Sequence, residues 1–278
     1  MPVAAPADNV QNAGEPTGPD AWFNSLPIIT RAWFGITLVL TLVGNFGILS
    51  PYYYLWNWDK MVGKFEVWRV LTSFCYAGGF DFNTLIAMYT LVTFSKNYET
   101  GGPFNTGAGG GTADYAFAML FGAAAILGTY PLLLSYLPPL FCRNMIYFVL
   151  YIWSRRHPTS QANIWGIPMK AIYLPFAYLA LTIFMGNPYF DQLHGMVIGH
   201  LFYFLAEVVP QVYGKDLLRT PLFLIDYFGV GNYIPAAPTN NQGRNNPWAN
   251  PPPAANNNEA RRGGGYNWGG GGRALGRD

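Results

Sequence analysis

Six apolar segments alternate with polar connections along the chain, at about 32–51, 82–97, 114–136, 140–154, 169–186 and 192–210. A helix that crosses a bilayer needs roughly 20 residues. The first, third and sixth segments reach that length, whereas the second and fourth are short enough to be core helices of a soluble protein. Together the six leave no polar face for water. The pattern therefore predicts a six-transmembrane-helix bundle, with its short helices accommodated by bilayer thinning or by shielding inside the bundle.

Polar, low-complexity sequence flanks these segments. Residues 1–21 are rich in Pro, Ala, Gly and Asp, and beyond about residue 232 the chain is mostly Asn, Pro, Gly and Arg. Neither stretch carries enough apolar surface to fold. We therefore expect a disordered tail (1–21), an all-α membrane domain (22–231) and a second disordered tail (232–278). The N-terminal stretch lacks the basic and apolar regions of a cleavable signal peptide, so membrane targeting is expected to come from the internal helices.

The composition supports a membrane domain. The chain is 51% hydrophobic and 11% charged, against about 25% charged residues in a typical soluble domain. Its net charge of +2 gives no support for nucleic-acid binding. Cys75 and Cys142 form neither a disulfide framework nor a zinc-type spacing, so we interpret both as small apolar side chains and expect no metal or cofactor.

Basic residues favour a cytosolic location for both termini. In that orientation the cytosolic helix ends carry Arg31, Lys96, Arg155, Arg156, Lys215 and Arg219. The other side carries Arg143 and three basic residues in the long loop 52–81, which reduces the bias without reversing it. That loop also holds many Tyr and Trp residues, which are typical of a segment lying in the membrane interface.

Two short motifs stand out. In the long loop, "EVWRVLT" runs from Glu66 to Thr72, and on its own it is best explained by interfacial anchoring. In the sixth segment, "DQLHGMVIGHLFYFL" contains Gly195 and Gly199. Small residues four apart let helix backbones approach closely, so this second motif predicts a packing seam.

With six helices, these motifs resemble the rhomboid superfamily. Its proteases need a Gly-x-Ser-Gly element on the fourth helix and a His three residues before the first glycine of the sixth-helix motif. Gln192 stands at that His position, and His194 and His200 are out of register. None of the serines, at positions 25, 50, 73, 95, 135, 154 and 160, lies in a Gly-x-Ser-Gly context. Without an imidazole to accept its proton a serine is not an activated nucleophile, so we expect no catalytic residues and interpret both histidines as packing or hydrogen-bonding residues.

The chain more closely resembles the Derlins, the non-proteolytic branch of this superfamily, over about residues 20–231. The matching stretches are "WFNSLPIITRAW", "EVWRVLTSF", "YIWSRRHP" followed by "MKAIYLPFAYL", "HGMVIGHLFYFL" and "LLRTPLFL". The resemblance implies a protein of the endoplasmic reticulum (ER) membrane that helps return misfolded proteins to the cytosol for ubiquitin-dependent degradation. By this resemblance, the family motif of the first loop consists of Glu66, Trp68, Arg69 and Thr72, and the helix-packing motif consists of Gly195 and Gly199.

The chain ends in "GGGYNWGGGGRALGRD". Here Trp268, Gly270, Gly272 and Leu275 fit the aromatic-x-Gly-x-Gly-x-x-Leu pattern of a peptide that recruits the hexameric AAA ATPase valosin-containing protein, with Trp in the place of the usual Phe. Some Derlins carry this peptide. Two apolar anchors on an extended, glycine-rich backbone suit a groove or a strand edge. The alternatives are a low-complexity end with a chance Trp and Leu, or an Arg-Gly segment that binds RNA, for which "RRGGG" at 261–265 is thin support.

Two other function classes stay open: an active intramembrane protease and an unrelated six-helix transporter or channel. A transporter is expected to show inverted repeats with interrupted helices, and no convincing repeat is visible. The chain could be a monomer, a homo-oligomer, or half of a groove completed by a ubiquitin-ligase complex. Asn45, Asp191 and Glu207 are candidates for lining a wetted groove, and each is equally explained as a helix–helix or interfacial residue.

Overall fold

The computed structural model describes residues 18–101, 111–133, 138–164 and 167–228, all within the unit Met1–Ile234. The C-terminal tail, with its motif at 268–275, lies outside the described residues. The elements follow the chain in the order α1 (Pro19–Asn24), α2 (Ile28–Asn45), η1 (Pro51–Tyr53), α3 (Trp58–Lys64), α4 (Trp68–Cys75), α5 (Phe82–Glu99), α6 (Gly111–Thr129), η2 (Tyr130–Leu132), α7 (Cys142–Arg156), β1 (Gln161–Ile164), β2 (Ile167–Lys170), η3 (Ala171–Tyr173), α8 (Leu174–Phe184), α9 (Phe190–Tyr203), η4 (Phe204–Val208), α10 (Val209–Tyr213) and α11 (Leu222–Phe228).

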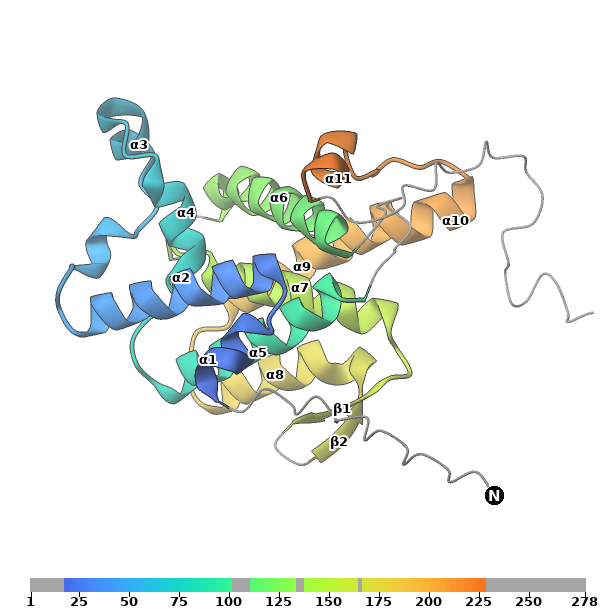
Figure 1. The fold of residues 1–278 in the computed structure, drawn as a ribbon, viewed down its shortest axis with the longest axis horizontal. Helices are drawn as coiled ribbons and strands as arrows, with labels where there is room; N and C mark the ends of the chain where they lie inside the picture. The colour runs from blue at the N-terminus through green and yellow to red at the C-terminus, as the bar shows by residue number, and fades with distance from the viewer. Residues whose placement is uncertain (1–17, 102–110, 134–137, 165–166, 229–278) are drawn as a thin grey trace, which may run out of the picture. The chain divides into compact units, whose positions relative to one another are not determined.

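Helix α7 lies at the centre of the bundle (Figure 1). Apart from Arg143, every side chain from Cys142 to Ser154 is buried, and the helix contacts α4, α5, α6, α8 and α9. A helix that is covered on all sides needs no polar face. Its 15 residues span only about 22 Å at 1.5 Å per residue, and the longer helices α5 and α6 help to shield that short length.

Three helical stretches of the described chain are long and apolar enough to cross a membrane, namely Ile28–Asn45, Gly111–Leu132 and Phe190–Tyr213. They correspond to the first, third and sixth predicted segments. Ala171–Phe184 is a shorter apolar helix, so the full count of six spans stays a prediction.

Several helices begin or end at other residues than the sequence predicts. The first spanning helix was expected at 32–51, but α2 occupies Ile28–Asn45 and is followed closely by Gly47, whose φ is +72°. A left-handed residue just beyond a helix commonly ends it. A short helix, α1, also begins at Pro19, inside the segment that was expected to be disordered.

A small β-hairpin departs from the all-α expectation. Strands β1 and β2 pair antiparallel, with Gln161 opposite Lys170 and Ile164 opposite Ile167. The strand β2 takes the residues that were expected to begin the fifth helix, since its antiparallel pairing with β1 binds their backbone in an extended conformation. Helix α8 therefore begins only at Leu174 and has a proline in its first turn, where proline is well accommodated.

A carboxylate from the end of α5 caps the start of α2. Glu99 Oε1 accepts a hydrogen bond from the Ile29 amide at 3.0 Å, and Oε2 accepts from the amide and the hydroxyl of Thr30 at 2.8 and 2.7 Å. The first amides of a helix lack intrahelical partners and favour nearby negative charge. Glu99 therefore fixes α2 against α5.

Candidate functional site

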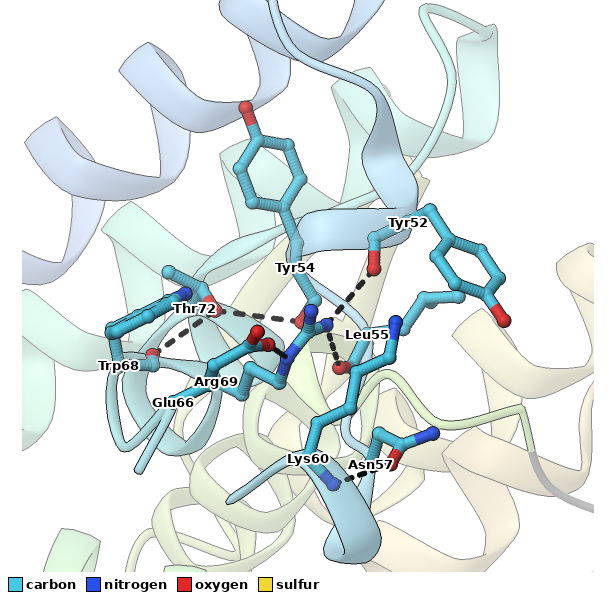
Figure 2. Close-up of polar contacts among 9 residues, drawn as sticks. All are labelled: Tyr52, Tyr54, Leu55, Asn57, Lys60, Glu66, Trp68, Arg69 and Thr72. Atoms are coloured by element: carbon cyan, nitrogen blue, oxygen red, sulfur yellow. Dashed lines mark hydrogen bonds and ion pairs between the residues drawn. The ribbon is translucent and has the colours of Figure 1, made fainter. Parts of the chain in front are cut away.

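The first-loop motif is built around the side chain of Arg69 (Figure 2). Its Nε pairs with Glu66 Oε2, and its Nη1 donates to the carbonyl oxygens of Tyr52 and Leu55, both at 2.9 Å. Arg69 is buried, so the guanidinium supplies the hydrogen bonds that water would otherwise give to these carbonyls. The arginine thus fixes the path of the chain between η1 and α4.

The other motif residues have different surroundings. The Thr72 hydroxyl lies 3.1 Å from the Trp68 carbonyl oxygen and 3.4 Å from that of Tyr54, so it supports the first turn of α4. The Trp68 side chain is 52% exposed. Other apolar side chains in and between α3 and α4 are exposed as well, namely Trp58, Val62, Phe65, Val67 and Leu71. Exposed aromatic and aliphatic side chains in a loop are typical of an interfacial segment. The motif therefore combines a buried structural arginine with an outward-facing tryptophan.

Gly195 and Gly199 face α7 at close range. A Cβ on Gly195 would overlap the backbone oxygen of Asn144 and lie 2.8 Å from its carbonyl carbon, and a Cβ on Gly199 would lie 3.0 Å from the backbone oxygen of Phe148. The ring of Phe148 also packs over Gly122 of α6, where an added Cβ would meet Cε1 at 2.9 Å. The glycine motif is thus part of a seam that joins α6, α7 and α9. Gly122 has no second glycine four residues away, so spacing could not reveal it.

His194 joins the same three helices through hydrogen bonds. Its Nδ1 lies 2.9 Å from Asn144 Nδ2, and its Nε2 lies 2.8 Å from Thr129 Oγ1. The amide nitrogen of Asn144 can only donate, so Nδ1 accepts and the ring proton is on Nε2. The Thr129 hydroxyl donates onward to the Ala125 carbonyl at 2.7 Å. Both ring nitrogens are therefore used in helix packing, as expected from the sequence.

Gln192 stands at the position where the resemblance to rhomboid proteases would require a histidine. It is buried, and its Nε2 donates to Thr182 Oγ1 at 2.9 Å, which links α9 to α8. A carboxamide has no basic nitrogen that could take a proton from a nucleophile at neutral pH. Within the described residues, the hydrogen bonds of His194 and His200 involve no serine.

A buried charge cluster lies at the other end of α7. Arg156 Nη2 lies 2.8 Å from Glu207 Oε1, and Arg156 Nη1 lies 3.4 Å from Asp114 Oδ2. The guanidinium also lies over the ring of Tyr98, 4.8 Å from its centroid. Thr220, ahead of α11, reaches Asp114 Oδ1 at 3.4 Å. The cluster ties α5, α6, α7 and η4 to the segment that leads into the C-terminal tail, and it makes Glu207 a helix–helix contact.

The other two candidate groove residues bond to nearby backbone. Asn45 Nδ2 donates to the Gly78 carbonyl at 3.2 Å, and its Oδ1 accepts from the Phe80 amide at 2.8 Å. Asp191 Oδ1 accepts from the Gln192 amide at 2.8 Å. Asn45 therefore holds the end of α2 against the segment before α5, and Asp191 supports the first turn of α9.

Cys75 and Cys142 are free and buried. Burial raises the pKa of the Cys75 thiol to about 12, so this thiol stays protonated at neutral pH and is a poor nucleophile. Both cysteines act as small core side chains, as expected. Across the described residues, no group of three or more His, Cys, Asp or Glu side chains is placed to hold a metal ion.

Comparison with known proteins shows which family the sequence matches. The profile of the Der1-like family matches residues 26–222. The chain is 34% identical to Derlin-1.2 of Zea mays over 233 residues, which is 81% of this chain and 93% of the relative. It is 32% identical to Derlin-1 of Arabidopsis thaliana over 210 residues, covering 74% of this chain and 75% of the relative. It is 30% identical to Derlin-2 of Oryza sativa subsp. japonica over 230 residues, covering 80% and 90%.

Proposed function

The chain belongs to the Der1-like family, and we propose that it is a non-proteolytic Derlin-type factor of ER-associated degradation. The family match over residues 26–222 carries the proposal. In this role the protein is a multi-pass protein of the ER membrane with both termini in the cytosol. It works with a ubiquitin-ligase complex and helps misfolded proteins move across or out of the membrane.

A short outward-facing helix supports a path for these clients. A polar chain crosses lipid at high cost because its backbone groups lose water and find no partners. Helix α8 exposes Phe176, Ile183 and Phe184, and its 11 residues span about 16 Å at 1.5 Å per residue, well short of the roughly 30 Å of a hydrocarbon core. A bilayer that thins beside such a helix shortens the distance that a client crosses without water.

The absence of proteolysis is supported by the polar groups at the start of α9. His194 is bonded to Asn144 and Thr129, and Gln192 is bonded to Thr182. These groups hold helices together, and neither gives a hydroxyl a base in the arrangement that acyl transfer needs. The proposed activity is therefore to move the client while its peptide bonds stay intact.

The force for extraction comes, in this proposal, from a valosin-containing-protein-type AAA ATPase recruited by Trp268, Gly270, Gly272 and Leu275. The side chains of Trp268 and Leu275 are the anchors, and the two glycines let the backbone lie close to the surface of the partner. A long tether from about residue 232 keeps the bound ATPase at high effective concentration beside the membrane domain.

The double variant Trp268→Ala with Leu275→Ala is expected to abolish capture of the ATPase, because it removes both apolar anchors. Co-purification from mild detergent followed by quantitative mass spectrometry measures this. The matched control is Trp248→Ala, which removes a tail tryptophan outside the glycine pattern and should leave capture unchanged. Protease protection should show normal membrane insertion of all variants. Equal capture by the double variant and the unmodified chain would reject the tail as the recruiting element.

A further inference from the structure

The last described helix lies beside the buried charge cluster at the end of α7. Helix α11 contacts α6 (Figure 1), where the Ile225 side chain packs against Ala113. Just before this helix Thr220 is buried, and its Oγ1 lies 3.4 Å from Asp114 Oδ1. We call Thr220 and α11 together the α11 latch, because they reach one carboxylate of the cluster.

The charge cluster holds three parts of the bundle together. Arg156 of α7 pairs with Asp114 of α6 at 3.4 Å and with Glu207 of η4 at 2.8 Å, and we call these three side chains the Arg156 clamp. Glu207 lies in a π-helical turn, a rare geometry that is frequent at functional sites. Ion pairs exposed to water contribute little, because water and salt screen both charges. The strength of the clamp therefore depends on the burial of Asp114, which is complete in this structure.

The α11 latch is held less firmly than the helices beneath it. Helix α11 has seven residues, whereas isolated helices are marginal below about 12–15 residues. Within α11 only Leu224 and Ile225 are buried, and the preceding residues 214–219 are mostly exposed. The contact of Thr220 with Asp114 is also longer than an ordinary hydroxyl–carboxylate hydrogen bond. Elements with few buried apolar contacts open first, so α11 is expected to detach before the bundle unfolds.

We propose that the α11 latch controls the Arg156 clamp. While α11 is docked, it keeps water from Asp114, and the clamp holds α6, α7 and η4 together. Once α11 detaches, water reaches Asp114, the ion pairs weaken, and this end of the bundle loosens. Residues 229–278 follow α11 directly in the sequence, so any partner that binds this tail is placed to shift the latch between its two states. The inference goes beyond the proposed function, because it requires no particular partner.

The test measures amide hydrogen exchange by mass spectrometry in the full chain, held in zwitterionic nanodiscs. Ile225→Ala is expected to speed exchange in α11 at least about tenfold, because the helix loses a buried isoleucine side chain. Exchange should also rise about two- to tenfold in residues 115–118 of α6 and in η4, the change expected when one hydrogen bond is lost. Tyr227→Ala is the matched control, since this side chain of α11 is 82% exposed, and it should change neither region.

Two variants of Thr220 isolate its hydroxyl group. Thr220→Val keeps the shape of the side chain but removes the hydroxyl, and it should speed exchange in residues 115–118 and in η4. Thr220→Ser keeps the hydroxyl and should leave both regions close to the unmodified chain. Identical exchange in the valine and serine variants would show that the contact with Asp114 does not hold the clamp, and would overturn the inference.

Salt tests whether release brings water to the ion pairs. Raising the salt concentration from about 0.1 M to about 1 M shortens the Debye length from about 10 Å to about 3 Å, and buried pairs are screened much less than exposed ones. Exchange in η4 should therefore rise with salt in Ile225→Ala and stay nearly constant in the unmodified chain. The same salt response in both proteins would contradict the proposed shielding.

Helix α8 serves as an internal reference, because it contributes no residue to the Arg156 clamp. A rise that is as large in α8 as in η4 would indicate general destabilisation and would overturn the inference. A rise confined to α11 would also overturn it, because the latch would then open without affecting the clamp. The measurement includes neither the ATPase nor a client, so its failure leaves the proposed function standing.

Discussion

Replacing Gly195 with alanine is expected to force α7 and α9 apart. Although it adds only one methyl group, the change should strongly lower the free energy of unfolding. The new Cβ would overlap the backbone oxygen of Asn144. Overpacking typically costs about 1–3 kcal/mol and occasionally more. The cost here should reach or exceed the top of that range because the obstacle is backbone, which cannot rotate away. Thermal unfolding in mild detergent, followed by size-exclusion chromatography, measures the loss.

Two other glycines provide a graded comparison. A Cβ on Gly199 would lie 3.0 Å from the Phe148 oxygen, and a Cβ on Gly128 in α6 would have nothing within 4 Å. Gly199→Ala should therefore be destabilising but milder, whereas Gly128→Ala should be neutral or stabilising, since alanine favours a helix over glycine by about 1 kcal/mol. If Gly195→Ala unfolds at the same temperature as Gly128→Ala, the proposed close packing of α7 and α9 is wrong.

Replacing Arg69 with leucine should disorder the first loop. The change leaves the carbonyl oxygens of Tyr52 and Leu55 without the donors that Arg69 supplies, and Glu66 without its partner. Hydrogen bonds from a charged donor contribute about 1.5–3 kcal/mol each, so the loop is expected to open before the rest of the bundle. Arg69→Lys should not restore it, because an ammonium cannot reproduce the planar arrangement of donors. Limited proteolysis and amide hydrogen exchange between residues 52 and 75 report the opening.

Two controls separate this effect from a general loss of charge or of an aromatic ring. Arg219 forms an ion pair with Asp216 at the same spacing of three residues, but its side chain is 56% exposed. Exposed pairs contribute about 0–1 kcal/mol, so Arg219→Leu should change little. Trp68→Ala should likewise preserve amide protection in the loop, because that side chain faces outward. Equal protection in Arg69→Leu and Arg219→Leu would contradict the structural role assigned to Arg69.

Local patterns were enough to identify part of this arrangement. The apolar runs located the three stretches that are long enough to span a membrane, since hydrophobic length is a property of consecutive residues. The spacing of Gly195 and Gly199 likewise indicated close helix packing before any partner was known. Each of these features is formed by residues of one helix, so it can be found without knowing the tertiary contacts.

Other contacts join residues that are far apart in the sequence, so no pattern of neighbouring residues predicts them. Glu99 caps a helix 70 residues away, and Arg156 meets Glu207 across 51 residues. In the sequence, Arg156 is simply one of several basic residues at a helix end. Its burial depends on how α6, α7 and η4 assemble, which is a tertiary property. The first-loop motif was found by resemblance, but only the structure separates the buried Arg69 from the exposed Trp68.

We propose that this protein moves intact clients out of the ER membrane by coupling a membrane bundle to a cytosolic ATPase. The most direct test is the half-life of a misfolded ER membrane protein, tagged at both ends, in cells that lack their own Derlins. Expression of the chain, or of its Trp248→Ala variant, should shorten the half-life while the client stays full length until it reaches the cytosol. The Trp268→Ala, Leu275→Ala variant should leave the client in the membrane at the half-life seen without the protein. Cleavage of the client within its spanning segment, or the same half-life with and without the chain, would contradict the proposed function.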